Sequence, residues 1–172
     1  MTIRVVLTFV AVVYVSWLAM QAVHELGHVL AAWLTGGTVV RVVLHPLTIS
    51  RTDVSPNAAP LAVAWAGPLV GVAIPLLLAL AFRLRRLSPA FDQSTPMRTT
   101  RRRLLADFFA GFCLVANGAY IGIGSFDHVG DAGDLLRNGS PQWLLIAFGL
   151  ASATTGLYFW HLASKRPLKE GL

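Results

Sequence analysis

The chain has 172 residues, of which 55% are hydrophobic and only 13% are charged. Soluble domains carry about 25% charged residues, and disordered chains combine low hydrophobicity with high charge, so this composition excludes disorder and argues against a soluble globular protein. A mean hydropathy of +0.64 points to a membrane protein. The single cysteine, Cys113, excludes an internal disulfide framework and a metal site built from several cysteines.

The net charge of +6 does not indicate nucleic-acid binding, because the basic residues are concentrated in one place. Seven of the fourteen Lys and Arg residues lie in one short stretch: Arg83, Arg85, Arg86, Arg98, Arg101, Arg102 and Arg103. Long apolar runs flank this stretch, and basic clusters beside membrane spans set topology and contact anionic lipid. We therefore expect a lipid bilayer, and not nucleic acid, as the partner of this charge. The same rule predicts that both termini lie in the cytoplasm.

Four apolar segments reach or approach the roughly 20 residues that a membrane helix needs, at about residues 5–34, 60–82, 104–123 and 143–162. We interpret the first as an uncleaved span rather than a signal peptide, because its apolar character continues past Ala31 and no small-x-small cleavage site follows. The sequence therefore predicts an all-α polytopic membrane protein with about four transmembrane helices. We expect one membrane-embedded domain over residues 1–172, multi-pass in the cell membrane.

A small β element is predicted between the first two spans. Gly36 and Gly37 end the first helix. Residues 38–44 are rich in β-branched side chains, and residues 47–52 alternate apolar and polar, which together indicate a short hairpin. The polar stretches are interpreted as connections, at residues 53–57, 88–100 and 124–141.

His24-Glu25-Leu26-Gly27-His28 is an HExxH motif inside the first predicted span. Residues i and i+4 share a helical face, so two histidines there can ligate one zinc ion while the glutamate serves as general base and acid. With five histidines and two glutamates in the chain, the count expected by chance is on the order of 0.002. The alternative, two packed histidines at a helix end, is costly because three ionisable groups would lie in an apolar segment. The motif therefore predicts a Zn²⁺ site with Glu25 as the catalytic residue.

A catalytic zinc site needs a third protein ligand and an open position. The extension HExxHxxGxxH is absent, and the only other glutamate, Glu170, lies in a basic tail. The remaining candidates are His45, His128, His161, Asp53, Asp107, Asp127, Asp131 and Asp134. The residues alone favour an aspartate of the 127–134 cluster, against the alternative that this cluster is a solvated loop of turn-forming residues.

These features resemble the site-2 protease family of intramembrane zinc metalloproteases. Besides the HExxH motif in the first span, Ala66-Gly67-Pro68-Leu69 is similar to the family's small-Gly-Pro motif. The run Asp131-Ala132-Gly133-Asp134-Leu135-Leu136 is similar to its Asp-Gly-Gly-x-x-Leu pattern, whose aspartate is the third zinc ligand. The resemblance implies a core of three spans, a small sheet that holds unwound substrate as an added strand, and zinc ligation by His24, His28 and Asp131.

The chain departs from the family pattern at three places. Ala132 replaces the second glycine of the aspartate motif, and Gly71 stands where asparagine is frequent. The Asn-x-x-Pro that precedes the aspartate is missing, because Ile123 occupies the expected place and Asn117 lies too far upstream. These departures bear on substrate handling more than on metal binding.

Asp134 is the rival of Asp131 for the third ligand position. Gly130 and Gly133 flank Asp131, so the backbone there can approach the HExxH helix closely. Asp134 is instead suited to be the N-cap of a helical turn at residues 135–137. Asp127 and His128 can instead hydrogen-bond to a metal ligand and orient it without contacting the metal.

We therefore expect zinc-dependent peptide-bond hydrolysis in or near the membrane. The alternative is a non-catalytic membrane adaptor or a zinc-binding structural relative, which would not need Glu25; a cation transporter is a weaker third option. The longest loops, of about 20 residues, are too short for a recognition domain. The substrate is then a membrane protein or peptide recognised by its own span, or a regulatory membrane partner presents it.

Overall fold

The computed structural model describes residues 2–84 and 96–165, and for residues 96–101 it describes the backbone alone. In chain order the elements are α1 (Ile3–Leu34), β1 (Val39–Val43), β2 (Arg51–Val54), α2 (Pro60–Leu84), α3 (Pro96–Asp127), α4 (Gly130–Arg137) and α5 (Gln142–Ser164).

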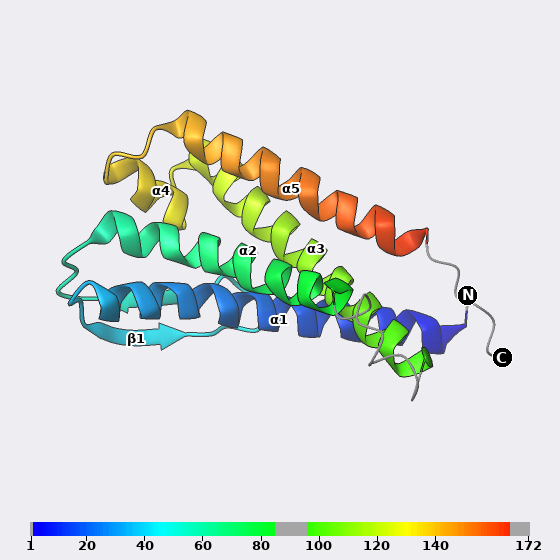
Figure 1. Ribbon diagram of the computed structural model, residues 1–172. Helices are drawn as coiled ribbons and strands as arrows, with labels where there is room; N and C mark the ends of the chain where they lie inside the picture. Colours follow the sequence, from blue (N-terminus) through cyan, green and yellow to red (C-terminus); the bar gives the residue numbers. More distant parts are fainter. Residues whose placement is uncertain (1, 85–95, 166–172) are drawn as a thin grey trace.

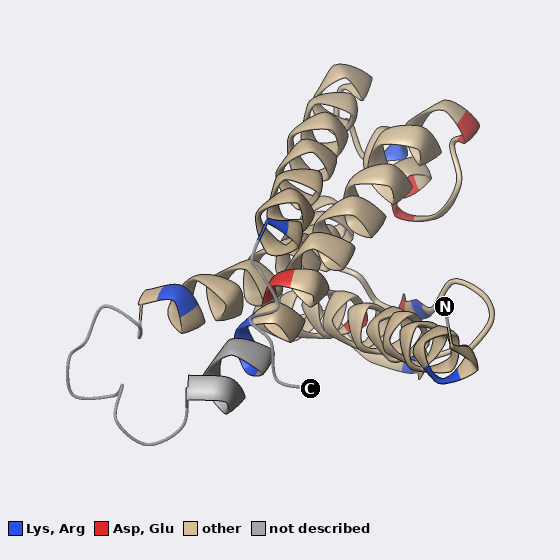
Figure 2. Cartoon of the chain, turned by 90° about the vertical axis from the view of Figure 1, so that its right-hand side faces the viewer, with Lys and Arg blue, Asp and Glu red and all other residues tan. Residues whose placement is uncertain are grey.

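The long helices run alternately in opposite directions, so that the start of α1 and the end of α5 lie at one end of the described structure, and the hairpin and α4 lie at the other (Figure 1). Within the described ranges, four helices are long and apolar enough to cross a membrane, and one two-stranded antiparallel sheet joins the first two. The prediction of about four spans with a small β element is therefore confirmed. Figure 2 shows that most of the ribbon carries no charged residue, as the composition requires.

The end of α1 is set by two adjacent glycines. Gly36 adopts a left-handed backbone with φ of 78°, and the N–H of Gly37 donates to the carbonyl of Ala32 at 2.8 Å. This is the Schellman arrangement that satisfies the last carbonyls of a helix. Pro60 begins α2 at the helical position where a missing N–H costs nothing.

The short helix α4 is held by apolar packing against the long helices. Its Ala132 and Leu135 are fully buried, in one cluster with Ala64 of α2, Ile121 of α3 and Leu145 of α5. Below this cluster α3 and α5 approach backbone to backbone, since a Cβ at Gly118 would lie 2.8 Å from the Gly149 carbonyl oxygen. This packing places the start of α4 beside the end of α1 and the start of α2, where the hairpin joins them.

The prediction that residues 124–141 form a polar connection is wrong for most of that stretch. α3 continues to Asp127, and α4 occupies Gly130–Arg137. The reason is the spacing of Ala132 and Leu135, which places two apolar side chains on one buried helical face. Of the predicted connection at 88–100, residues 88–95 lie outside the described residues, and Pro96–Thr100 belong to α3.

The second strand begins later than the alternation at 47–52 suggested. Residues 46–48, beginning with Pro46, form a bend. β2 runs over Arg51–Val54, with Asp53 opposite Arg41. The backbone N–H of Ser50 donates to Gln21 Oε1 of α1 at 2.8 Å rather than to a strand. Asp53, expected in a turn, is therefore a strand residue that pairs with the Arg41 guanidinium at 2.9 Å.

Candidate metal centre and active site

The HExxH residues lie on the buried side of α1. His24, Glu25 and His28 are 6%, 3% and 5% exposed, and the two imidazole rings meet edge to face with centroids 4.9 Å apart. α2 crosses them closely because both helices carry glycine at the crossing. A Cβ at Gly27 would overlap the Ala66 carbonyl, and a Cβ at Gly67 would overlap the His28 ring and lie 2.7 Å from His24 Nε2. The Gly-Pro motif of α2 therefore makes room for the histidine pair.

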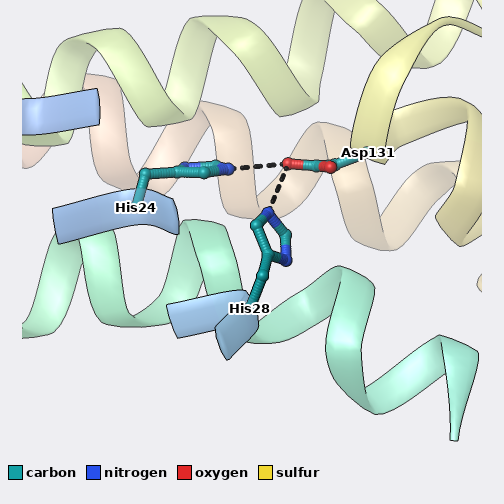
Figure 3. Close-up of side chains that lie close together, drawn as sticks. All are labelled: His24, His28 and Asp131. Atoms are coloured by element: carbon teal, nitrogen blue, oxygen red, sulfur yellow. Dashed lines mark hydrogen bonds and ion pairs between the residues drawn. The ribbon is translucent and has the colours of Figure 1, made fainter. Parts of the chain in front are cut away.

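Asp131, near the start of α4, reaches both histidines (Figure 3). Its Oδ2 lies 2.7 Å from His24 Nε2 and 3.3 Å from His28 Nε2. One potential ligand atom from each of the three residues lies within 4.8 Å of the other two. Among the described residues this is the one such group of His, Cys, Asp or Glu side chains. The remaining candidates from the sequence lie outside it: His45, His128, His161, Asp53, Asp107, Asp127 and Asp134.

The outer nitrogens of both imidazoles are fixed by acceptors. His24 Nδ1 lies 2.6 Å from Asn117 Oδ1, and the Asn117 amide is oriented by its own Nδ2, which donates to the Cys113 carbonyl at 2.9 Å. His28 Nδ1 lies 2.7 Å from the Val63 carbonyl oxygen. A carbonyl oxygen only accepts, so both rings donate through Nδ1.

The inner nitrogens then face the carboxylate with lone pairs when the rings are neutral. Two imidazole lone pairs and a carboxylate oxygen repel one another unless a proton or a cation lies among them. Two nitrogens and one oxygen, with each imidazole oriented by a hydrogen bond on its far side, are the donor set and support that zinc takes in catalytic sites. The residues present therefore fit a zinc ion.

Asp131 is aimed by the turn between α3 and α4. His128 and Gly130 both adopt left-handed backbone, with φ of 57° and 55°, and the Asp131 N–H donates to the Tyr120 hydroxyl at 3.2 Å. A Cβ at Gly130 would overlap that hydroxyl, so the close backbone approach is to Tyr120 of α3. Burial disfavours the ionised form of Asp131, but protons on the two facing imidazole nitrogens of His24 and His28 outweigh burial and hold the pKa of this carboxyl well below its usual range.

Asp134 does not have the N-cap role predicted for it. Val129 precedes the first residue of α4, and Asp134 lies in the middle of the helix. It is exposed and pairs with the Arg137 guanidinium one turn later, at 2.5 Å. Its carboxylate is directed to that arginine rather than to the histidines.

Glu25 is held by the hairpin. The Thr52 hydroxyl of β2 donates to Glu25 Oε2 at 2.7 Å, and this hydrogen bond links the strand directly to the HExxH helix. Sequence reasoning did not select Thr52, Tyr120 or Asn117 for the site. Asn117 carried a usable signal, since an amide in the middle of an apolar span is costly without a partner.

Two cavities meet at this centre. A cleft of about 620 Å³ is bordered by His28, Asp131 and the whole of β2. A smaller cavity of about 130 Å³ lies between α1 and α3 and is bordered by His24 and Glu25. Two of the four side chains of the centre therefore border each space: His28 and Asp131 the cleft, and His24 and Glu25 the smaller cavity.

Comparison with known proteins agrees with the motif. Residues 1–92 match the family described as Peptidase M50B-like. No curated protein and no solved structure matches the chain. The matched residues include the HExxH motif and Ala66–Leu69 and end before Asp131, whose place beside the histidines comes from the tertiary structure. Since the match covers more than half of the 172 residues, the chain belongs to the Peptidase M50B-like family, which is related to the site-2 proteases.

Proposed function

We propose that this protein is a membrane-embedded zinc metalloendopeptidase that hydrolyses a peptide bond of a membrane protein or membrane-bound peptide. The observation that carries the proposal is the convergence of His24 Nε2, His28 Nε2 and Asp131 Oδ2 beside the buried carboxylate of Glu25. A site that only bound zinc for structural reasons would have no need of that carboxylate.

His24, His28 and Asp131 would hold the zinc ion, which when bound polarises the scissile carbonyl and lowers the pKa of the attacking water. Glu25 takes the proton of the attacking water and delivers it to the leaving amide nitrogen. Thr52 donates to Oε2 of Glu25, which leaves Oε1 for the proton transfer. Asn117 and the Val63 carbonyl keep the two imidazoles in the tautomer whose Nε2 can ligate.

The substrate would enter the 620 Å³ cleft as an extended segment. Six consecutive residues, Ile49 to Val54, border this cleft, and they include all of β2. β2 pairs with β1 along one side, so a substrate segment added along its other side would gain main-chain hydrogen bonds. An extended segment also presents its carbonyl to the zinc site, whereas a helix keeps its carbonyls in internal hydrogen bonds.

The test combines metal analysis with cleavage of a defined probe, a single-span membrane protein tagged at both ends and co-expressed with the enzyme. We expect one zinc per chain in the wild type and in Glu25→Gln, no zinc in His24→Ala, and cleavage by the wild type alone. Absence of zinc from the wild type, or cleavage by Glu25→Gln at the wild-type rate, would refute the proposal. Full zinc content with no cleavage of any single-span probe would favour the adaptor alternative.

A further inference from the structure

The smaller cavity, between α1 and α3, differs from the cleft in size and in the residues that line it. We propose that it is a subsite for one medium-sized aliphatic side chain, of the valine or leucine class, from the substrate residue next to the cleaved bond. This inference rests on the proposed function, and it adds a substrate preference to the site.

The position of the cavity assigns it to the residue beside the scissile bond. His24 and Glu25 border the small cavity, whereas His28 and Asp131 border the large cleft, so the hydrolytic centre lies between the two. Ile49, Ser50 and Tyr120 border both spaces. An extended segment that lies along β2 therefore passes from the cleft to the small cavity where it crosses the centre.

The two side-chain amides in the cavity wall, those of Gln21 and Asn117, are already paired. Gln21 Oε1 accepts hydrogen bonds from the N–H and the hydroxyl of Ser50, at 2.8 and 2.5 Å, and Gln21 Nε2 donates to the His45 carbonyl at 3.1 Å. Asn117 likewise uses both ends of its amide, toward His24 and Cys113. A polar substrate side chain would lose its hydrogen bonds to water and find these groups engaged.

Away from His24, Glu25 and Tyr120, which face the hydrolytic centre, the surface that remains for a ligand is apolar. Trp17 and Met20 of α1 and Ala116 of α3 form it, and the one polar atom of Trp17, Nε1, donates to the Pro46 carbonyl at 3.1 Å. Such a cavity does not hold water well, because a buried water needs two to four polar partners. An aliphatic group is therefore the occupant that the wall favours.

The volume limits the size of that group. The cavity measures about 130 Å³, slightly less than the apolar cavity of about 150 Å³ that accepts a benzene molecule. A valine or leucine side chain fits this space, and an indole does not. A lipid acyl chain that enters between α1 and α3 is the competing occupant, and the test below separates the two.

The probes are short peptide hydroxamates, which chelate zinc and place a single variable side chain beside it. The side chain is that of Gly, Val, Leu or Trp, and the dissociation constant for the zinc-loaded, detergent-solubilised wild type is measured by calorimetry. We expect the Leu compound to bind at least about tenfold more tightly than the Gly compound, since a filled apolar pocket discriminates by such factors. The Trp compound should gain nothing over Gly.

Two Ala→Leu variants locate the pocket. Ala116→Leu fills it, and should reduce the advantage of the Leu compound over the Gly compound to less than about twofold. Ala151→Leu makes the same change at an exposed position of α5 and should leave the preference intact. Met20→Ala enlarges the pocket and should allow the Trp compound to bind more tightly than the Gly compound. Zinc content and unfolding temperature confirm that each variant is folded.

Equal affinities of all four compounds for the wild type would overturn the subsite, because they mean that an acyl chain fills the cavity or that side chains do not reach it. A preference for Leu that survives in Ala116→Leu would overturn it as well. In both cases zinc-dependent hydroxamate binding still supports the proposed function. Failure of the wild type to bind zinc or any hydroxamate would refute the proposed function and the subsite together.

Discussion

Asn117 Oδ1 lies 2.6 Å from His24 Nδ1, although the two residues are 93 positions apart in the chain. The amide comes from the middle of α3 and reaches across to the HExxH helix. Gly71 of α2 makes this approach feasible, because a Cβ there would lie 2.8 Å from Asn117 Oδ1. The glycine at 71, a departure from the family pattern in which asparagine is frequent, thus faces an asparagine that another helix supplies.

Asn117→Ala should weaken zinc binding about 10- to 100-fold, since loss of the hydrogen bond that orients a ligating imidazole typically has that effect. Zinc affinity is measured by competition with a chromogenic chelator. Gly71→Asn combined with Asn117→Ala should recover part of the affinity by returning an amide to the same space. Asn138→Ala is the control, because this side-chain amide, just after α4, donates to the Asp134 carbonyl and not to a histidine among the described residues. Unchanged affinity in Asn117→Ala would show that His24 does not depend on the amide.

Asp131→Ala should abolish stoichiometric zinc binding, whereas Asp134→Ala should retain it. Asp131 reaches both imidazoles, and Asp134 is exposed and paired with Arg137. Asp127→Ala and His128→Ala should also keep zinc. The measurement is metal content per chain after purification. Loss of zinc from Asp134→Ala with retention in Asp131→Ala would mean that Asp134, and not Asp131, is the ligand.

Gly67→Ala should destabilise the protein by about 1–3 kcal/mol, because the added methyl overpacks the space beside the two imidazoles. Its Cβ would lie 2.7 Å from His24 Nε2, so zinc content should fall as well. Gly122→Ala is the comparison, since its Cβ would meet the Gly149 Cα of α5 at 3.2 Å, away from the histidines. That variant should lower the unfolding temperature without loss of zinc. Full zinc in Gly67→Ala would contradict the tight crossing of α1 and α2.

Thr52→Val should keep zinc and lower kcat about ten- to a hundredfold, because a hydrogen bond to a charged group contributes about 1.5–3 kcal/mol. The effect should fall on kcat rather than KM, since the hydroxyl positions Glu25 and the isosteric valine preserves the strand. Thr52→Ser should restore most of the activity. Thr48→Val, at an exposed position of the bend before β2, is the control. Wild-type kcat in Thr52→Val would mean that Glu25 is held by other contacts.

The arginine-rich stretch should lie in the cytoplasm, and the hairpin end of the molecule outside. A cysteine introduced at position 93 should react with a membrane-impermeant maleimide only after the cells are permeabilised. A cysteine at Leu47, which is 80% exposed in the bend of the hairpin, should react in intact cells. The native Cys113 is buried and should stay silent. The reverse labelling pattern would place the HExxH end of α1 in the cytoplasm and contradict the charge rule.

Local information in the sequence was sufficient for the spans and for bringing two of the three residues of the candidate metal centre onto one helical face. Hydropathy over windows of about 20 residues depends only on neighbouring residues, and it located all four long helices. His24 and His28 share a helical face because they are four positions apart, whatever the rest of the chain does. Gly36 and Gly37 ended α1 where expected for the same local reason.

The tertiary structure decided which distant groups complete the site. Asp131 lies 107 positions from His24 and reaches it only because Ala132 and Leu135 bury α4 among the long helices. Asn117 and Thr52 meet the HExxH residues through helix crossing and strand placement, and no local pattern encodes either contact. The second strand begins at Arg51 and not at residue 47, because the Ser50 N–H donates to Gln21 of α1 and is not available to a neighbouring strand. Contacts of this kind depend on packing between segments far apart in the chain, whereas spans and an i, i+4 histidine pair depend on the segment alone.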